Sequence, residues 1–376
     1  MKYLIFSDNP VITEKIVKQV GEDSVATIYN LESFANYPSV ILPDVLPING
    51  LEKFSEEKKG GVQALIALDA NRQKGNLQLG QSFFRRLEIA IAGTLKQHNI
   101  EFMFLLSPYT RIYGKFPNIN ISQGSLNRLT LGLIAEVFQT YPNEFAGKEL
   151  DFWFCTWDEP ERNLDFADTL KLPHVFSYCT TYSMKDRVIA FPDFNTCYNE
   201  EKFHDKINSM AKCREVAEKK WHENKIFWRG SLFVSFSRRC LFELGKKYPE
   251  YLHIEDTLKG KFVPMIEQAN YKYLIDARGN GWSGRLQTLL KLGRVIFVAD
   301  RPYREWYFNR LIPMKHYVPV EEDMSDLIEK YLFMENHPEI YEKIVRNMGE
   351  FVEENLNPRR IVFDAKELLL KYGVVG

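Results

Sequence analysis

Cysteine is scarce in this sequence of 376 residues: there are five, scattered along the chain, and none lies in a Cys-x-x-Cys pair. An odd number of cysteines without paired spacing argues against a disulfide framework and against a cysteine-based zinc site. Such cysteine usage favours a reducing compartment, and we therefore expect the protein to be cytoplasmic.

Long hydrophobic runs are missing as well. The first residues, MKYLIFSDN, hold only a short apolar run before polar residues, which indicates a first strand rather than a signal peptide. No stretch approaches the roughly 20 apolar residues that a membrane-spanning helix needs. We expect a soluble protein whose contact with a membrane, at the inner face of the cytoplasmic membrane, is at most peripheral.

An excess of either charge is also lacking, since 49 lysines and arginines stand against 50 aspartates and glutamates. This balance argues against a nucleic-acid partner bound through bulk positive charge. Hydrophobic residues make up 45% of the chain and aromatic residues 14%, which indicates a well-packed core. The length suffices for two domains of ordinary size.

Several chemical signatures are absent. No His-Glu-x-x-His or His-x-x-x-His pattern points to zinc, and no glycine-flanked serine points to a hydrolase. A Walker loop and a dinucleotide-binding Gly-x-Gly-x-x-Gly are missing too. No Asp-x-Asp pair follows an expected strand, where a metal-dependent sugar transferase would hold Mg²⁺ or Mn²⁺. We therefore expect no metal and no other cofactor.

What the chain does have is a regular alternation of apolar patterns, which predicts an α/β fold with parallel sheets. Strands are expected at 2–6, 24–29, 38–42, 62–68, 101–106, 150–155, 174–179, 225–229, 272–276, 294–298 and 316–319. Helices are expected at 10–20, 80–98, 124–140, 236–247, 262–269, 284–292, 323–335, 338–353 and 358–371.

The turn-forming residues suggest how these elements are divided. Two polar or turn-rich stretches, 71–81 and 108–125, are expected to be long loops, which in α/β domains often bind ligands. A junction near FPDFNTCYNEE (191–201) predicts two α/β domains with a cleft between them. The predicted domains cover 1–190 and 191–350, and a C-terminal helix at 351–376 is expected to pack back on the first.

The most informative stretch is YKYLIDARGNGWSGR (271–285). An apolar strand runs into a turn that holds two glycines and two arginines, and a helical pattern then ends at Gly293, an expected C-cap. Free backbone N–H groups and the start of a helix favour an anion there. Two arginines suggest a diphosphate rather than a lone carboxylate. The alternative is a tight turn whose arginines are merely solvated.

A second basic motif is NKIFWRGS (224–231), in which a short expected strand ends at Arg229. The carboxyl end of a strand is where open α/β sheets bind ligands. The alternative is that Arg229 pairs with a surface carboxylate. A helix that carries two further arginines, Arg238 and Arg239, follows this motif.

An acidic motif, DFWFCTWDEP (151–160), completes the candidate set. An apolar strand ends there at Asp158 and Glu159, and Pro160 follows. A carboxylate at the end of a strand is well placed to act as a general base in a cleft. The alternative is that Asp158 only caps the loop. If a carboxylate acts here, Asp158 is our preferred candidate and Glu159 the other.

Together these segments resemble glycosyltransferase family 90. The resemblance lies in KIFWRGS, YKYLIDARGNGWSGRLQTLLKLGRVIFVAD and REWYFNRLIPMKHYVPVEEDMSDL, in that order, between about Arg128 and about residue 355. It implies a GT-B fold of two Rossmann-like domains, with the acceptor bound mainly by the first domain and the nucleotide sugar by the second. It also implies inverting, metal-independent transfer from a UDP-sugar.

The same resemblance assigns roles to residues of this chain. Asp158 takes the place of the catalytic base, and Arg229 that of the arginine that binds the diphosphate. The turn around Gly281 takes the place of the turn that binds the sugar nucleotide. The residues expected to bind the UDP-sugar are Arg229, Ser231, Arg278, Asn280, Gly281, Trp282, Ser283, Gly284 and Arg285.

Our leading hypothesis is an enzyme that moves a sugar from a UDP-sugar to a saccharide or glycolipid acceptor. The process would be the synthesis of a bacterial lipopolysaccharide or lipooligosaccharide core, or of a capsule. One alternative is a protein O-glycosyltransferase that transfers glucose or xylose, and another is an inactive nucleotide-sugar-binding protein. A Rossmann oxidoreductase is disfavoured because its fingerprint is missing.

Overall fold

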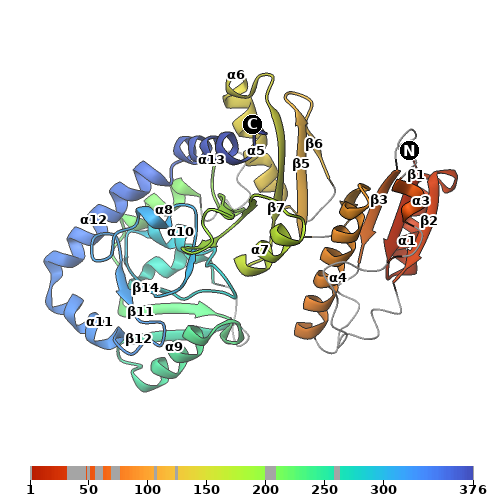
Figure 1. Ribbon diagram of the computed structural model, residues 1–376. Helices are drawn as coiled ribbons and strands as arrows, with labels where there is room; N and C mark the ends of the chain where they lie inside the picture. The colour runs from red at the N-terminus through yellow and green to blue at the C-terminus, as the bar shows by residue number, and fades with distance from the viewer. Residues whose placement is uncertain are drawn as a thin grey trace.

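The structure of the chain is a computed structural model (Figure 1). It describes residues 2–31, 48, 51–55, 62–68, 77–105, 108–122, 126–199, 209–257 and 263–375. Three sheets follow one another along the chain, and a two-stranded ribbon connects loops of the second and third. The predicted α/β class with parallel strands is thereby confirmed.

The first sheet has four parallel strands in the order β2-β1-β3-β4. The strands are β1 (Lys2–Ser7), β2 (Val25–Asn30), β3 (Val62–Ala67) and β4 (Glu101–Phe104), and the helices of this region are α1 (Pro10–Val20), α3 (Glu52–Ser55) and α4 (Leu77–Gln97). The central strands β1 and β3 carry buried apolar runs, as parallel strands covered on both faces do. The edge strand β2 alternates between half-buried and exposed residues.

The second sheet is mixed and has the order β10-β8-β7-β5-β6. Its strands are β5 (Tyr109–Lys115), β6 (Asn120–Ile121), β7 (Glu149–Cys155), β8 (Val175–Ser177) and β10 (Val188–Ala190), and its helices are α5 (Arg128–Thr140), α6 (Pro142–Phe145) and α7 (Pro160–Thr169). The loop predicted at 108–125 is wrong, because β5 and β6 form an antiparallel hairpin there. The glycine, proline and asparagines that suggested a loop mark the hairpin turn and its flanks, while the tyrosines and isoleucine of β5 pair with β7.

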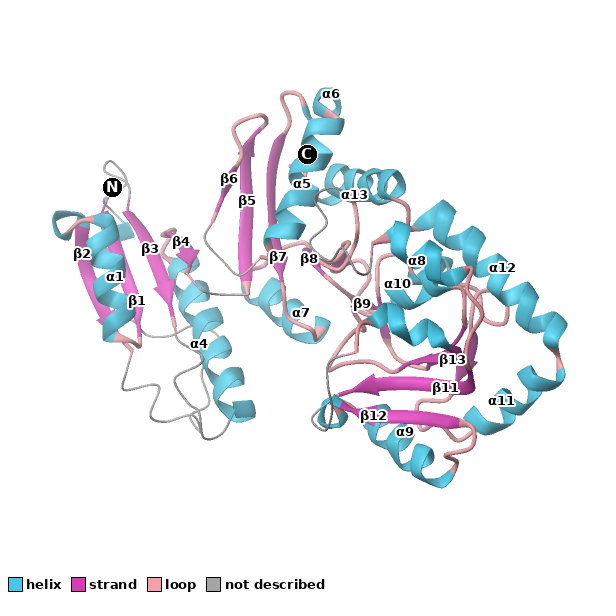
Figure 2. Cartoon of the chain, turned by 180° about the vertical axis from the view of Figure 1, so that it is seen from behind, coloured by secondary structure: helices cyan, strands magenta, loops and turns pink. Residues whose placement is uncertain are grey.

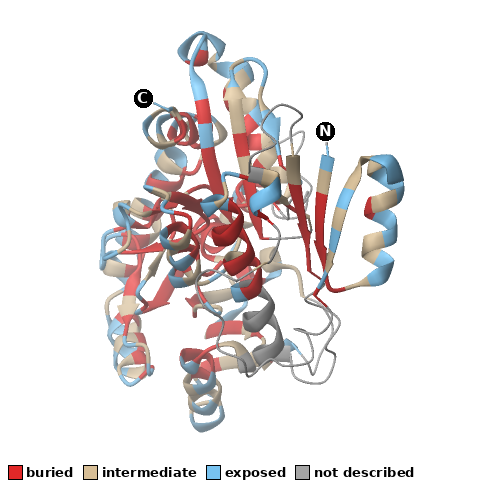
Figure 3. Cartoon of the chain, turned by 45° about the vertical axis from the view of Figure 1, so that its right-hand side comes forward, coloured by how far each residue is buried: buried red, intermediate tan, exposed pale blue. Residues whose placement is uncertain are grey.

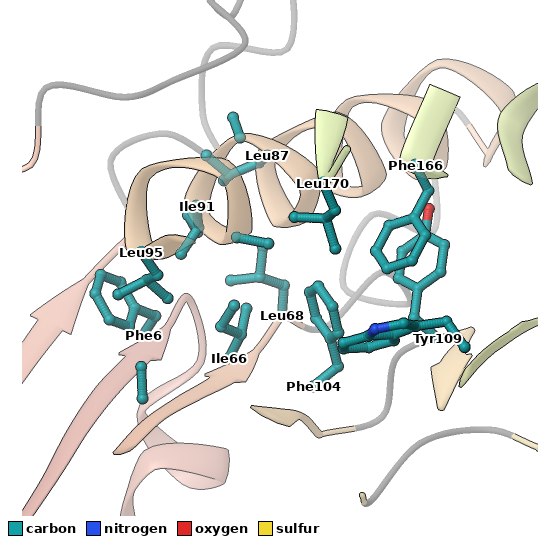
Figure 4. Packing of buried hydrophobic residues seen from close by; sticks show 14 of the residues in the cluster. Phe6, Ile66, Leu68, Leu87, Ile91, Leu95, Phe104, Tyr109, Phe166 and Leu170 are labelled. Atoms are coloured by element: carbon teal, nitrogen blue, oxygen red, sulfur yellow. The ribbon is translucent and has the colours of Figure 1, made fainter. Parts of the chain in front are cut away.

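One hydrophobic cluster joins the first sheet to the second (Figure 4). Leu87 and Ile91 of α4 lie in it beside Phe104 of β4. From the second sheet, Tyr109 stacks on Phe166 of α7 with ring centroids 3.9 Å apart. Burial of large aromatic side chains in one cluster stabilises the association of the two sheets.

The third sheet is fully parallel and has the order β12-β11-β13-β14-β16. Its strands are β11 (Glu223–Gly230), β12 (Leu252–Asp256), β13 (Tyr271–Asp276), β14 (Val295–Ala299) and β16 (Val318–Val320), and its helices are α8 (Met210–Ala217), α9 (Phe236–Lys247), α10 (Leu286–Leu289), α11 (Leu327–Asn336) and α12 (Pro338–Asn355). Helices pack on both faces, because one hydrophobic cluster joins the strands to α8 and α10 and another joins them to α9 and α11. Buried residues, red in Figure 3, lie in the interior of the molecule. The strands are therefore almost continuously apolar.

Two helices of this region differ from the sequence-based expectation. The helix expected at 262–269 is a 3-10 helix at Met265–Asn270. The helix expected at 284–292 is a single α-turn, α10, followed by a 3-10 turn at Leu290–Leu292. Gly293 ends it in the left-handed conformation, with φ of 63°, so the predicted glycine cap is confirmed.

The C-terminal helix α13 (Pro358–Tyr372) leaves the third sheet and returns to the second. It lies beside α5 in both ribbon views (Figures 1 and 2). Its residues Ile361, Ala365 and Leu369 belong to the same hydrophobic cluster as Leu133 of α5. Val374 then forms an antiparallel bridge to Leu150 of β7.

A short ribbon connects the loops at the carboxyl side of the second and third sheets. It pairs β9 (Thr180–Thr181), which follows β8, with β15 (Tyr303–Arg304), which follows β14. This ribbon, β10, β12, α7 and α8 were not expected from the sequence, because each is short or lacks a clear apolar period. The strand expected at 38–42 lies outside the described residues, and the boundaries at 190 and 350 stay predictions. Across the described ranges, no helix is both long and apolar enough to cross a bilayer.

Candidate active site

A pocket of about 550 Å³ lies at the carboxyl ends of β11 and β13. Five residues predicted from the sequence line it, namely Arg229, Trp282, Ser283, Gly284 and Arg285. The other lining residues are Arg238 of α9 and Thr257, Val263, Met265 and Gln268. The pocket therefore has a basic wall and a mixed polar and apolar wall, a combination that suits an anionic group joined to a flat, polar one.

Two arginines of the basic wall stand out because, among the described residues, neither forms an ion pair with a carboxylate. Arg238 is 8% exposed and donates only long hydrogen bonds, of 3.2 and 3.3 Å, to backbone carbonyls. Arg285 keeps part of its surface open and donates to the carbonyl of Arg229 at 2.8 Å. The carboxylate of Asp276 acts on both electrostatically, but it is bound to Arg301 at 2.5 Å.

The pKa values of these two arginines reflect the missing counter-charge. Burial, together with the nearby charge of Arg285, lowers the pKa of Arg238 to about 10. Burial also lowers the pKa of Arg285. Both guanidinium groups contact the indole of Trp228, whose ring centroid is 5.5 Å from that of Arg238 and 5.3 Å from that of Arg285. A cation–π contact offsets only part of the cost of a buried charge, so the pair favours an anion in the pocket.

The position of Arg229 differs from the prediction that it serves only to bind the diphosphate. It lines the pocket, but its guanidinium is bound to Glu255 of β12 at 2.5 Å. The ion pair that was the alternative interpretation of Arg229 is therefore present, while the residue also faces the pocket. The strand β12 that supplies Glu255 was not predicted, so the partner could not be named from the sequence.

The glycine turn after β13 lies against the loop that carries Asp158. A methyl group added at Gly281 would stand 1.6 Å from the carbonyl oxygen of Asp158, a distance that no side chain could occupy. On its other side, the same carbonyl accepts a hydrogen bond of 3.3 Å from the thiol of Cys179. The structure thus brings Asp158 beside the turn, as the two strand-end motifs predicted.

Gly230 is needed for a similar reason. A Cβ atom there would lie 2.5 Å from the ring of Trp228 and 2.9 Å from the guanidinium of Arg285. Because Gly230 has no side chain, Arg285 can reach the backbone carbonyl of Arg229 in β11. This hydrogen bond joins the two basic motifs of the sequence, 224–231 and 271–285.

A buried polar network holds the glycine turn from below. The hydroxyl of Ser283 donates to Asp276 at 2.5 Å, and its backbone N–H donates to Glu305 at 3.4 Å. Arg301, with both partners fully buried, binds Asp276 at 2.5 Å and Glu305 at 2.9 Å. The Ser283 side chain, predicted to bind the sugar nucleotide, is thus engaged inside the protein, although Ser283 lines the pocket.

The remaining predicted residues do not line the pocket. Arg278 turns back on its own loop, where it donates to the carbonyl of Asn280 at 3.0 Å and pairs with Glu322 at 3.2 Å. Asn280 is exposed, and the backbone carbonyl of Ser231 accepts a hydrogen bond from Arg238. Arg278 and Asn280 therefore shape the turn, and Ser231 holds Arg238.

Asp158 lies in the loop between β7 and α7, and its side chain is exposed at the surface. Desolvation by the surrounding protein raises its pKa, which the indole of Trp282, as a hydrogen-bond donor, and the charge of Arg162 partly counteract. A carboxylate with a raised pKa is a stronger base than an ordinary aspartate. Glu159, the other candidate, pairs with Arg162 at 3.4 Å.

Asp158 lies against the turn that leads into the pocket, and the pocket is lined by two arginines that have no carboxylate partner among the described residues. Such a site can remove a proton from a hydroxyl group while it stabilises negative charge on a leaving group. The helix after the turn is a single α-turn, so the positive charge comes mainly from guanidinium groups rather than from a helix dipole. In the part of the chain that the structure describes, no three His, Cys, Asp or Glu side chains gather as metal ligands.

Arg238 is the charged lining residue of this pocket that was not predicted from the sequence. Its position on the helix after the Trp-Arg-Gly-Ser motif was noticed, but Arg239 beside it gave the same signal. Only Arg238 is buried, whereas Arg239 is exposed. The period of α9, whose apolar face includes Leu241, could have placed Arg238 on the inner side.

The chain is similar in sequence to a family of known proteins. The sequence profile of "Glycosyl transferase family 90" matches residues 120–375. Among curated proteins, the chain is 29% identical over 213 residues to Protein O-glucosyltransferase 2 of Danio rerio, which covers 53% of this chain and 42% of that protein. It is 23% identical over 239 residues to Protein O-glucosyltransferase 3 of Homo sapiens, covering 60% of this chain and 46% of that protein. The chain thus spans less than half the length of these relatives.

Two solved structures show weaker similarity. TarM matches with a TM-score of 0.41 and 10% identity, covering 85% of this chain and 57% of that chain. HepE of Anabaena, in complex with UDP-glucose, matches with a TM-score of 0.36 and 10% identity over 99% of this chain and all of that one.

All five cysteines of the present chain are free thiols.

Proposed function

The chain belongs to glycosyl transferase family 90, and from that premise we propose that it transfers a sugar from a UDP-sugar to an acceptor hydroxyl, with inversion and without a metal. The observation that carries this proposal is the pair Arg238 and Arg285, which line a pocket and have no carboxylate partner among the described residues. A diphosphate supplies the charge that this pair lacks.

In the proposed reaction, Asp158 takes the proton of the acceptor hydroxyl as the acceptor oxygen attacks the anomeric carbon. The bond between that carbon and the β-phosphate oxygen breaks on the opposite face, and UDP leaves with the electron pair. Attack opposite to the leaving group inverts the anomeric carbon. A positioned base contributes about 10²–10⁴-fold to the rate, and the arginines stabilise the charge that develops on the diphosphate.

Two acceptor classes are in contention. We propose a saccharide or glycolipid of a bacterial surface polysaccharide, such as a lipopolysaccharide core or a capsule, with the enzyme acting in the cytoplasm. The free state of all five cysteines supports a reducing compartment. The second candidate is a protein hydroxyl, because the matched relatives are named protein O-glucosyltransferases. A catalytically inactive binding protein is disfavoured because Asp158 lies against the turn that leads into the pocket lined by Arg238 and Arg285.

The sugar donor can be tested before the acceptor is known. Thermal unfolding with UDP-glucose, UDP-galactose and UDP-xylose should show stabilisation by at least one of them, because a ligand that binds only the folded state raises its stability. Release of UDP is then measured with water, a mixture of saccharides or serine-containing peptides as acceptor. Asp158→Asn should abolish UDP release and keep UDP binding. Full activity of Asp158→Asn would falsify the assignment of the base.

A further inference from the structure

Gln268 is a buried glutamine in the mixed polar and apolar wall of the pocket. It belongs to the 3-10 helix Met265–Asn270, is 6% exposed and lines the pocket. Among the described residues, its side-chain amide forms no hydrogen bond. Because buried amides in proteins are normally hydrogen-bonded, an amide left open in the wall of a pocket indicates a polar ligand.

Gln287, which is also buried, shows how the fold satisfies a glutamine outside the pocket. It is 2% exposed, and its amide nitrogen donates to the two carboxylate oxygens of Asp193 at 3.0 and 2.9 Å. Its amide oxygen accepts a hydrogen bond of 3.0 Å from the hydroxyl of Thr196. Both ends of that amide are therefore used within the protein. Gln268 has the same donors and the same acceptor, and they remain available to a ligand.

The side chains of the wall indicate which part of a nucleotide Gln268 binds. A diphosphate offers only acceptors and would leave the amide oxygen without a partner, whereas the arginine pair can use it fully. Uracil presents an N–H donor beside a carbonyl acceptor on one planar edge, which matches both ends of an amide. The faces of its ring are flat, and Val263 and Met265 give the same wall an apolar surface.

We propose that Gln268 binds the uracil base of the sugar nucleotide. Its amide oxygen accepts the hydrogen bond from the N3–H group of the base, and its amide nitrogen donates to the adjacent carbonyl oxygen, O4. None of the three basic or acidic motifs of the sequence contains this residue. The inference rests on the proposed function, because it names the residue that recognises the nucleotide part of the UDP-sugar.

The test combines Gln268→Met, which keeps the length of the side chain and removes the amide, with a ligand that lacks the matching donor. Calorimetry measures the Kd of the wild type and the variant for UDP, for UDP methylated at N3 and for pyrophosphate. We expect methylation at N3 to weaken binding to the wild type about tenfold to hundredfold, the loss of two hydrogen bonds. Gln268→Met should weaken UDP binding by a similar factor, and methylation should then cost little more. Pyrophosphate should bind both proteins equally.

Gln287→Met is the matched control, since it removes a buried amide outside the pocket. It should lower the stability of the protein, while methylation at N3 weakens binding as much as in the wild type. An equal effect of methylation on the wild type and on Gln268→Met would overturn the inference. So would a loss in Gln268→Met that depends on the ribose 2′-hydroxyl instead, as measured with 2′-deoxy-UDP. A wild type that binds neither UDP nor pyrophosphate contradicts the proposed function itself, so the two failures are distinguishable.

Discussion

Arg238→Met separates binding from folding at the proposed diphosphate site. Burial and the charge of Arg285 lower the pKa of Arg238 from the ordinary arginine value to about 10. This shift corresponds to about 3 kcal/mol against the charged form in the folded state. The sign follows from linkage: the depressed pKa of a cation weakens the folded state below the folded pKa, and stability recovers as the pH rises through it.

Removal of the charge should therefore change the free energy of unfolding, measured without added UDP, only slightly. The two long carbonyl hydrogen bonds that Arg238 donates are worth about 1 kcal/mol each, and their loss is offset by the end of the unfavourable charge burial. Binding should respond in the opposite way, because a hydrogen bond to a charged group contributes about 1.5–3 kcal/mol. We expect the Kd for UDP to rise about tenfold to hundredfold, while the free energy of unfolding stays the same or increases.

Arg294→Met is the matched control for this experiment. Arg294 is also a buried arginine, 2% exposed, but it lies outside the pocket and donates hydrogen bonds of 2.6–2.9 Å to carbonyls that include those of Ala269 and Lys219. Its loss should destabilise the protein by about 2–4 kcal/mol and leave UDP affinity unchanged. Calorimetry and urea unfolding measure both quantities. An Arg238→Met variant that binds UDP like the wild type would contradict the role of Arg238 in diphosphate binding, and one that unfolds as easily as Arg294→Met would contradict its unfavourable burial.

Three further predictions concern the base, the turn and the paired arginine. Activity should rise with pH through a midpoint above about 3.9, the ordinary value for aspartate, because the raised pKa of Asp158 belongs to the group that must be deprotonated; a midpoint at the ordinary value contradicts this. Gly281→Ala should lose most activity through its collision with the Asp158 loop, whereas Gly349→Ala, where nothing lies within 4 Å of the added Cβ, should keep it; equal kinetics for the two would refute the close approach. Arg229→Ala should weaken UDP binding several-fold and also lower stability, because Glu255 loses its arginine partner and keeps only its contact with His253; unchanged UDP affinity would restrict Arg229 to a structural role.

Much of the fold was predictable because its signals are local. The alternation of apolar runs predicted four of the five strands of the third sheet, all except β12. Gly293 marked the end of the helix at 284–292, because glycine adopts the left-handed conformation most easily. The strand-end positions of Asp158 and Arg229 followed from the same periodicity. The proximity of Asp158 and Arg229 to Gly281 could then be expected, because ligands bind at the carboxyl ends of parallel strands.

The features that the sequence did not reveal depend on contacts between distant segments. The hairpin of β5 and β6 was mistaken for a loop because its turn residues outweighed a short strand that gains its stability from β7. Arg238 looks like any surface arginine until α9 is placed against Trp228. Likewise, the side chain of Ser283 was expected at the ligand, but the buried Asp276, bound to Arg301, attracts its hydroxyl.

A crystal structure of the protein with UDP bound tests the proposed diphosphate site most directly. We expect the diphosphate to lie in the 550 Å³ pocket, within hydrogen-bonding distance of the guanidinium groups of Arg238 and Arg285. We also expect the β-phosphate to point towards Trp282, the lining residue next to the Gly281 turn against which Asp158 packs. A diphosphate bound elsewhere, or one that leaves both arginines without a contact, would contradict the proposed site.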